Sequence, residues 1–308
     1  MSTAPANTIT PAIQLTRLTK QYAGTKKPAL RNVSLTVQRG EVYGFLGPNG
    51  AGKSTTIRCL LNFILPTSGG ASILGKDSVD DSVAIRRNLG YLSGDVALYK
   101  RMTGQQFLSF MATLQPLKHP GHIRELTRDF RAELSTPIDT LSKGNRQKIG
   151  LIQAFMHEPD ILILDEPTSG LDPLMQEVFF AQISAARARG ATVFVSSHYL
   201  PEVRRICDRI GFIRDGRLVA EQSIAELAAS AAHTFDITFS EAIPLTDFTR
   251  FKNLHVTPSH DPRHITVEVH GDLMPFLRAL ARHRVIQFDQ RAVNLEEEFM
   301  RLYGKDDE

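Results

Sequence analysis

Residues 47–55 combine residue types and a spacing that favour phosphate binding. Their letters, GPNGAGKST, fit the pattern G-x-x-x-x-G-K-S/T between an apolar run and a helical pattern. Glycines let backbone amides approach phosphate oxygens closely, and the N-terminus of a helix adds a favourable dipole. Lys53 can reach the β- and γ-phosphates, and Ser54 can ligate Mg²⁺. The predicted nucleotide contacts are Gly47, Pro48, Asn49, Gly50, Ala51, Gly52, Lys53, Ser54 and Thr55.

Two carboxylates and a histidine follow further apolar runs. The run 160–166, DILILDE, ends in Asp165, which would hold Mg²⁺, and Glu166, which could orient and deprotonate an attacking water. An acidic pair is often only the solvated start of a loop, but beside a phosphate loop it favours chemistry. His198 ends the run TVFVSS at 192–197, where ligand sites of α/β proteins form. It can donate to the γ-phosphate and hold the water with Glu166. Lys53, Glu166 and His198 are therefore the candidate catalytic residues.

A second turn before a helix raises a question of its own. Residues 141–147, LSKGNRQ, would present exposed amides to an anion, as the first loop does. One nucleotide does not need two such cradles from the same chain.

The elements that must position these residues read as an α/β layered core over 12–232. Apolar runs at 41–47, 160–166 and 192–197 alternate with helical stretches and are typical of buried parallel strands. GFIRDGRLVAE predicts a hairpin with Asp215 and Gly216 in its turn. The order of these elements places the candidate residues at strand ends.

A helical subdomain is predicted within this core at about 96–155. Its first helix should begin with a capping box of Thr103 and Gln106. Two apolar faces are expected, one formed by Phe107, Phe110, Met111 and Leu114, the other by Ile123, Leu126, Phe130 and Leu134.

Residues 233–308 predict a small separate α/β domain. Alternating apolar residues at 235–239 and 265–269 indicate two strands, and 273–283 and 295–303 indicate helices, the second capped by Asn294 with Glu297. His260, Asp261 and His264 in SHDPRH are interpreted as loop residues rather than metal ligands, because a proline turn precedes a strand there.

Composition narrows the setting of the protein. The chain has 308 residues and a net charge of +3 spread along it, so no nucleic-acid-binding arm is predicted. No apolar run approaches the ~20 residues of a membrane-spanning helix. Cys59 and Cys207 both lie in helical patterns, which favours a reduced, cytosolic setting. Residues 1–11 are expected to be a disordered leader.

The ordered set GPNGAGKST, LSKGNRQ, LILDEPTSGLDP and SSH resembles the nucleotide-binding subunits of the ATP-binding cassette (ABC) family over about 12–230. The resemblance implies a P-loop NTPase core that binds ATP and Mg²⁺. In that family two such domains close head to tail, and the signature loop of one covers the γ-phosphate of the other. Ser142, Gly144 and Asn145 would then bind the partner's ATP, so the two cradles belong to two sites and the chain should dimerise.

The resemblance carries over to further positions and shows two departures. Asp172 matches the loop that crosses the dimer interface, and Tyr22 matches the aromatic residue that stacks on adenine, with a packed core aromatic as the alternative. Lys143 and Asn145 stand where the signature usually has glycine and glutamine. Gly94 stands where the family has a glutamine near the metal, so Asp95 is a candidate metal contact.

The resemblance implies the ATPase of an exporter of the drug-resistance type, bound to the cytoplasmic face of a membrane. A separate permease would span the bilayer, a second cassette, identical or merely similar, would complete the sites, and no nucleic acid would be bound. The alternative is a non-transport ABC ATPase in translation or DNA maintenance. Those proteins carry paired cassettes, coiled coils or zinc modules, which are not recognised here. An ordinary P-loop kinase or GTPase has no use for LSKGNRQ.

Overall fold

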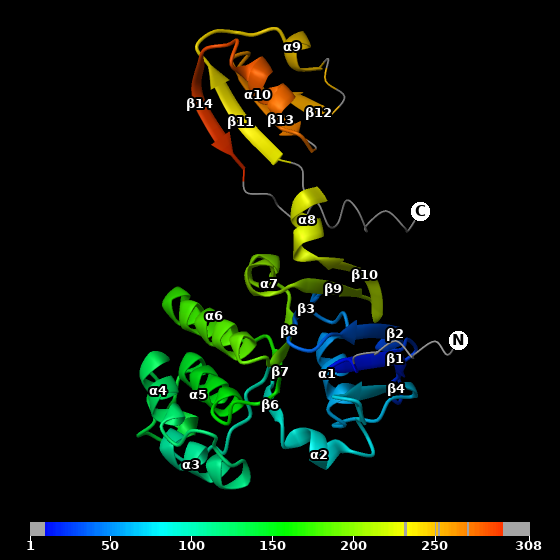
Figure 1. Cartoon of the computed structure of the whole chain (residues 1–308), viewed down its shortest axis with the longest axis vertical. Coiled ribbons are helices and arrows are strands. Elements are labelled where there is room, and N and C mark those ends of the chain that lie inside the picture. Colours follow the sequence, from blue (N-terminus) through cyan, green and yellow to red (C-terminus); the bar gives the residue numbers. More distant parts are fainter. Residues whose placement is uncertain (1–9, 231–232, 250, 252, 270, 292–308) are drawn as a thin grey trace, which may run out of the picture. The chain divides into compact units, whose positions relative to one another are not determined.

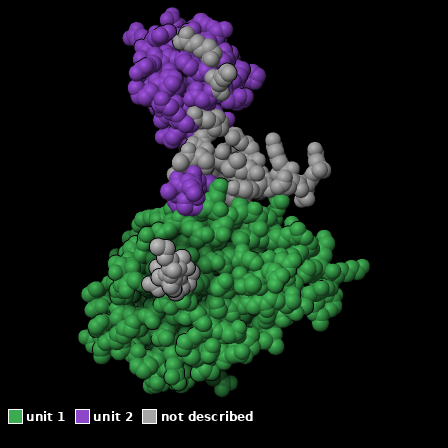
Figure 2. Space-filling view, turned by 45° about the vertical axis from the view of Figure 1, so that its right-hand side comes forward, with its two compact units in different colours: residues 1–222 green, residues 223–308 purple. Residues whose placement is uncertain are grey.

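The structure is a computed structural model that describes residues 10–291 except 231–232, 250, 252 and 270. The chain divides into two compact units, Met1–Gln222 and Ser223–Glu308 (Figure 2). The division therefore falls ten residues before the one expected after 232. The predicted leader, apart from residues 10 and 11, and the predicted helix 295–303 with its Asn294 cap lie outside the described residues.

The first unit is built on a six-stranded sheet in the order β10-β9-β3-β8-β7-β6 (Figure 1). The strands from β9 (Arg209–Arg214) through β3 (Val42–Leu46), β8 (Thr192–Ser197) and β7 (Ile161–Asp165) to β6 (Leu89–Leu92) are all parallel. Every residue of β3, β7 and β8 is buried, which confirms the expected buried strands. Because the strands are parallel, their carboxyl ends meet at one edge, where the candidate residues lie.

The predicted hairpin joins β9 to β10 (Arg217–Ser223). Asp215 and Gly216 have positive φ values of 48° and 75°, as a two-residue hairpin turn of the primed type requires. This prediction is confirmed.

A second, four-stranded sheet was not anticipated from the sequence. It has the order β2-β1-β4-β5 and consists of β1 (Ile13–Lys20), β2 (Leu30–Val37), β4 (Ser68–Ile73) and β5 (Lys76–Asp77), with antiparallel pairing. Helix α1 (Lys53–Leu60) contacts β4 of this sheet and β7 of the central sheet (Figure 1). Ile57 and Leu60 of α1 are fully buried in the shared apolar core, so the helix after the phosphate loop is held from both sides.

Helices α6 (Pro173–Ala188) and α7 (Leu200–Ile206) pack on the central sheet. Gly44 of β3 permits a close approach of α7, because an added Cβ there would lie 2.2 Å from Val203 Cγ1. Cys207 follows the last residue of α7 rather than lying within the helix, whereas Cys59 lies in α1 as expected. Both cysteines are free and buried.

The helical subdomain contains α3 (Gly104–Leu114), α4 (His122–Asp129) and α5 (Lys143–Phe155), and the short α2 (Ser82–Arg86) precedes it. The capping box of Thr103 and Gln106 is present. The predicted apolar face of α3 is only partly right: Phe107 is buried, but Phe110 and Leu114 are 38% and 60% exposed. The ring of Phe110 packs against that of Tyr99, which is itself exposed.

The second predicted helix is shorter than expected. Helix α4 ends at Asp129, and Arg131 has a positive φ of 49°, which ends the helical conformation. Phe130 and Leu134 are still buried, as predicted, but from positions after the helix.

The second unit contains α8 (Ile224–Ser230) and a four-stranded sheet in the order β12-β13-β11-β14. From β11 (His233–Phe239) the elements run through α9 (Thr246–Thr249), β12 (Leu254–Pro258), β13 (His264–Val269) and α10 (Met274–Leu280) to β14 (Val285–Gln290). This β-α-β-β-α-β succession with antiparallel pairing is of the ferredoxin-like type. The strands at 235–239 and 265–269 and the helix near 273–283 confirm their predictions, while β12 and β14 were not predicted.

Asp261 and His264 of the segment SHDPRH have hydrogen-bond partners within the protein. Asp261 accepts hydrogen bonds from the backbone N and the guanidinium of Arg263, and His264 Nδ1 lies 3.1 Å from Thr238 Oγ1. Within the part of the chain that the structure describes, no three His, Cys, Asp or Glu side chains gather to hold a metal.

Among the described residues, no helix combines the length and the apolar character needed to cross a bilayer.

Candidate nucleotide-binding and hydrolysis site

The phosphate loop joins β3 to α1 in a conformation that its glycines make possible. Gly50 and Gly52 have φ values of +82° and +112°, a region that side chains with a Cβ rarely adopt. The loop, the start of α1, Ala29 and Glu166 line a pocket of about 200 Å³, whose loop and helix members are Asn49, Gly50, Gly52, Lys53, Ser54 and Thr55. The amides at the head of α1 and the helix dipole favour an anion here.

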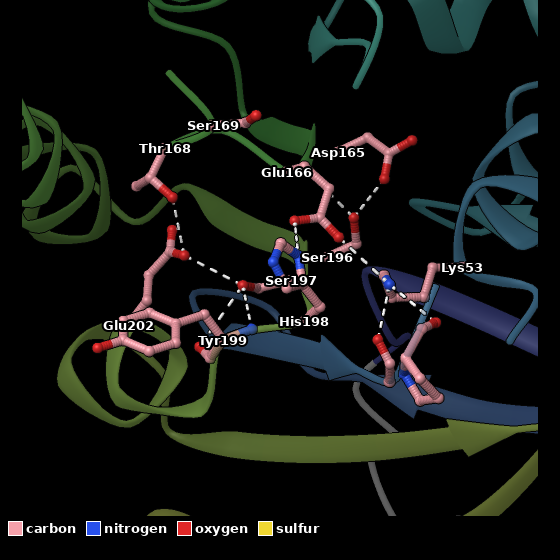
Figure 3. A network of polar contacts seen from close by, with 12 residues as sticks. Lys53, Asp165, Glu166, Thr168, Ser169, Ser196, Ser197, His198, Tyr199 and Glu202 are labelled. Atoms are coloured by element: carbon pink, nitrogen blue, oxygen red, sulfur yellow. Dashed lines mark hydrogen bonds and ion pairs between the residues drawn. The ribbon is translucent and has the colours of Figure 1, made fainter. Parts of the chain in front are cut away.

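Lys53 lies where this loop meets the carboxylates. Its side chain is 6% exposed, and Nζ donates hydrogen bonds to the carbonyl oxygens of Gly47 (2.7 Å) and Pro48 (3.2 Å). The same nitrogen lies 3.2 Å from Glu166 Oε1 (Figure 3). This arrangement holds one positive charge between the loop and the proposed base, where it can offset phosphate charge.

Asp165 and Glu166 are both positioned by Ser196 of the neighbouring strand β8, which pairs with Asp165 in register. Ser196 Oγ donates a hydrogen bond to Asp165 Oδ1, and the backbone N of Glu166 donates to Ser196 O at 3.1 Å (Figure 3). Glu166 has a φ of +50°, a conformation that costs ~1–3 kcal/mol for a non-glycine residue. Sequence reasoning quoted SSH but used only its histidine, so this role of Ser196 was missed.

His198 meets Glu166 from the end of β8. Its Nδ1 lies 2.7 Å from Glu166 Oε2, and its side chain is 56% exposed (Figure 3). Glu166 therefore spans Lys53 and His198, one through each carboxylate oxygen. A base held between a lysine and a histidine at the mouth of a phosphate loop can orient an attacking water.

The predicted metal ligands Asp165, Ser54 and Asp95 differ in their burial and in the pockets that they line. Asp165 is buried, and Gly94 lies against it, since an added Cβ at Gly94 would be 3.3 Å from Asp165 Oδ2. Ser54 lines the phosphate-loop pocket. A carboxylate and a hydroxyl are the oxygen donors that Mg²⁺ prefers, so these two residues fit the ion. Asp95 is exposed and lines another pocket with Lys100 and Arg146.

Tyr22 lies beside the phosphate loop rather than in the core. Its hydroxyl is 3.4 Å from Thr55 Oγ1, its ring is partly exposed, and Lys20 Nζ lies 5.5 Å from the ring centroid. The open area of the ring is compatible with stacking of a base.

The signature residues form the start of α5. Ser142 is exposed and caps this helix, accepting a hydrogen bond from the backbone N of Asn145 at 3.2 Å. Gly144 packs closely on the loop before Asp172, since an added Cβ would lie 2.7 Å from Gly170 O. Asp172 is exposed and caps α6 through Met175 N. None of the described residues that line the phosphate-loop pocket comes from 141–147.

The side chain of Asn145 is used within its own chain. Its Nδ2 donates to Glu133 O at 2.7 Å, and its Oδ1 accepts from Glu133 N at 2.9 Å. Any contact of Asn145 with a nucleotide would therefore come from its backbone amide.

Two links between α5 and the carboxylate loop were missed from the sequence. Gln147 is buried, and its Nε2 donates to Pro167 O at 2.7 Å. Lys143 Nζ lies 3.2 Å from Ser169 Oγ. The only sequence signal for them was their place in the motif LSKGNRQK.

Comparisons with known proteins identify the class. A sequence model of the ABC transporter family matches residues 30–169. Among solved structures, an ATP-binding subunit of an ABC transporter superposes with a TM-score of 0.65 at 32% identity, covering 70% of this chain and 91% of that one. A dimeric structure of a bacterial ABC transporter cassette gives a TM-score of 0.63 at 25% identity, covering 69% and 98%.

Three curated relatives are similar over most of the first unit's length. The probable multidrug ABC transporter ATP-binding protein YbhF of Escherichia coli is 37% identical over 234 residues, 74% of this chain but only 39% of that protein. The bacitracin transport ATP-binding protein BcrA of Bacillus licheniformis is 36% identical over 212 residues, 68% of this chain and 69% of that protein. The ABC transporter ATP-binding protein NatA of Bacillus subtilis is 34% identical over 226 residues, 71% and 92%.

The fold is that of an ABC ATPase with a P-loop NTPase core. The chain belongs to the ATP-binding proteins of ABC transporters. The three relatives quoted are transport proteins, and none is a translation or DNA-maintenance factor.

Proposed function

We propose that this chain binds and hydrolyses ATP to drive an ABC exporter whose membrane-spanning permease is a separate polypeptide. The observation that carries the proposal is Glu166 held between Lys53 and His198 beside the phosphate loop. Relatives named for multidrug and bacitracin transport support export of an antibiotic-like compound. The chain would then work on the cytoplasmic face of the membrane, where ATP is supplied.

ATP binds through residues of the first unit. The Tyr22 ring stacks on the base, and the 47–55 loop and the head of α1 hold the phosphates. Ser54 and Asp165 would hold Mg²⁺, whose charge offsets that of the transferring phosphoryl group.

Two copies are needed to complete each site. Ser142 and Asp172 are exposed, and the signature residues do not reach the pocket of their own chain. The dimeric structure of a similar cassette supports pairing of two such chains. On closure, Ser142, Gly144 and the backbone amide of Asn145 in each copy contact the nucleotide of the other. The Asn145 amide exchanges its hydrogen bond to Ser142 Oγ for one to the phosphate.

Hydrolysis depends on the group around Glu166. Its carboxylate orients the attacking water and accepts a proton from it, and His198 holds the water and the γ-phosphate in line. Lys53 offsets the charge that develops on the phosphoryl group. Reopening of the dimer then resets the permease.

The first test replaces the base. Glu166→Gln should reduce ATP turnover to background while ATP affinity is kept, and it should trap an ATP-bound dimer, because the amide cannot accept the proton. ATPase rate, nucleotide binding and size-exclusion chromatography measure the three effects. Glu177→Gln is the matched control, since Glu177 forms an exposed ion pair with Arg205 away from the site. Wild-type turnover in Glu166→Gln would remove Glu166 from its role.

The second test asks where the signature acts. Ser142→Arg should abolish hydrolysis but leave ATP binding by the monomer intact, because the bulky cation obstructs only the partner's nucleotide. Ser109→Arg, on the exposed part of α3, is the control. Loss of ATP binding by the monomeric Ser142→Arg protein would show that the signature serves its own chain.

The partner is identified by co-purification. The Glu166→Gln protein is tagged in its native host, membranes are solubilised gently with ATP, and co-purifying polypeptides are identified by mass spectrometry. A multi-span polypeptide at near one-to-one is expected. Recovery of ribosomal or DNA-associated proteins with no membrane protein would replace the exporter proposal by the non-transport alternative.

A further inference from the structure

A second glutamate lies buried behind the hydrolysis site. Glu202 belongs to α7, four residues after His198, and is 6% exposed. Its Oε2 accepts hydrogen bonds from Thr168 Oγ1 at 2.9 Å and from Ser197 Oγ at 3.0 Å (Figure 3). Its Oε1 is buried without a hydrogen-bond partner among the described residues. A buried carboxyl group on a helix that could have carried an apolar residue needs an explanation.

The two hydroxyl groups that donate to Glu202 belong to residues close in sequence to the two proposed catalytic side chains, Glu166 and His198. Thr168 follows Glu166 by two residues, and Ser197 immediately precedes His198. Ser197 Oγ also accepts a hydrogen bond from Tyr199 N at 3.0 Å, so it holds the backbone on both sides of His198. One carboxyl group therefore ties the loop after the base to the strand end that carries the histidine.

The buried surroundings of Glu202 shift the pKa of its carboxyl group away from that of a surface glutamate. Burial raises the pKa of Glu202, the hydrogen bonds from Thr168 and Ser197 act against that shift, and the nearby Glu166 carboxylate raises the pKa further. The neutral acid therefore persists to higher pH than in an ordinary glutamate. A neutral carboxyl group can accept both hydroxyls without placing a second negative charge behind Glu166.

We propose that Glu202 is a positioning residue for ATP hydrolysis, which holds the 166–169 loop and residues 197–199 together so that Glu166 Oε2 and His198 Nδ1 stay 2.7 Å apart. The inference rests on the proposed function of the Glu166 site. Glu202 itself touches neither of the two side chains directly and acts through Thr168 and Ser197.

The experiment compares two substitutions of similar volume in the full-length protein. Glu202→Leu fills the space but offers no acceptor, whereas Glu202→Gln keeps a carbonyl oxygen for both hydroxyls. Glu202→Leu should lower kcat by about 10- to 100-fold, because small misplacements of catalytic groups cost that much, with KM for ATP unchanged. Glu202→Gln should retain kcat close to that of the wild type. Glu125→Gln, at an exposed position of α4, is the control.

A double substitution tests whether the effect runs through the histidine. In a His198→Ala background, Glu202→Leu should lower kcat much less than it does alone, since the group that it positions is gone. Full additivity of the two losses would overturn the inference.

Four other outcomes would also count against the inference. Wild-type kcat in Glu202→Leu, or equal losses in Glu202→Leu and Glu202→Gln, would overturn the inference. If Glu202→Leu does not fold, Thr168→Val removes one of the two donors at nearly constant volume, and an unchanged kcat there would overturn it equally. Absence of ATP hydrolysis in the wild type would instead overturn the proposed function, and this inference with it.

Discussion

For single residues, the site depends on side chains that hold the candidate catalytic and metal-binding residues in place through hydrogen bonds. Ser196 holds the carboxylate of Asp165 through its hydroxyl and the backbone of Glu166 through its carbonyl. These bonds keep Glu166 at its positive φ, which presents the carboxylate to both Lys53 and His198. The position of Glu166, the proposed base, thus depends on the neighbouring strand as much as on its own loop.

Ser196→Ala should therefore weaken the metal site. The substitution removes the hydrogen bond to Asp165, and bonds to charged groups contribute ~1.5–3 kcal/mol, so the Mg²⁺ concentration for half-maximal ATPase activity should rise about tenfold or more. Titrating the ATPase rate with Mg²⁺ measures the change. Ser184→Ala, whose hydroxyl bonds only to Phe180 O within α6, is the control. An unchanged Mg²⁺ requirement would mean that Asp165 is held without Ser196.

The departures from the family motif also have an explanation at this scale. The side chain of Asn145 bonds to both backbone groups of Glu133, which fixes the head of α5 to the preceding loop. Lys143 lies along Gly170 and reaches Ser169, so it contacts the loop before Asp172. Both side chains therefore support the signature turn in their own chain.

At the element scale, α7 connects the central strand to the hydrolysis site. Its close contact with β3 depends on Gly44, where an added Cβ would also lie 3.0 Å from Cys207 Sγ. The same helix carries Glu202 to Thr168 and Ser197. A displacement of α7 would therefore shift Thr168 and Ser197, which lie close in the chain to Glu166 and His198.

Gly44→Ala should destabilise the first unit. The added methyl group meets Val203 Cγ1 at 2.2 Å, and overpacking of this kind costs about 1–3 kcal/mol in the free energy of unfolding. Chemical denaturation followed by circular dichroism measures the loss. Gly70→Ala in β4 is the control, because an added Cβ there has no atom within 4 Å. Equal stability of Gly44→Ala and the wild type would contradict the close packing of α7 on β3.

Helix α5 connects the signature turn to the loop that follows Glu166. It begins at the exposed Ser142 cap, and Gln147, further along, bonds to the carbonyl oxygen of Pro167. Because α5 also packs against α3 and α4, the helical subdomain and the carboxylate loop share one helix.

At the scale of the whole molecule, the two units have separate apolar cores. The core of the first unit surrounds α1, and that of the second is formed by α9, α10 and one face of its sheet, with Phe235, Phe248 and Phe276 among its members. The residues assigned to nucleotide all lie in the first unit. Ligand binding should therefore stabilise only that unit.

Calorimetry of the Glu166→Gln protein should show two unfolding transitions. With Mg²⁺ and ATP at a hundred times Kd, the first unit's midpoint should rise by roughly 5–10 °C, while the other stays constant. A Lys53→Ala version should show a much smaller shift. A single transition that moves as a whole on adding ATP would mean that the units unfold together.

Several features of the first unit could be predicted from the amino-acid sequence alone. They are the phosphate loop, the buried parallel strands, the hairpin at Asp215 and Gly216 and the positions of Asp165, Glu166 and His198 at strand ends. These features depend on local requirements, such as glycine where φ is positive and apolar runs where both faces of a strand are buried. The alternation of apolar and polar residues at 235–239 and 265–269 predicted two strands correctly for the same reason, because it is a pattern between residues close in sequence.

Which distant residues contact one another could not be predicted from the sequence and is seen in the folded chain. The bond from Ser196 to Asp165 joins residues 31 positions apart, and the bond that Glu202 accepts from Thr168 joins residues 34 positions apart. In the second sheet, β1 pairs with β4, which lies beyond β2, β3 and α1 in the chain. The exposure of Phe110 and Leu114 depends on which side of α3 is covered by neighbouring elements, and the spacing of apolar residues along the helix does not contain that information. Such contacts follow from strand register and helix packing, because these are set by the whole core and not by any one segment.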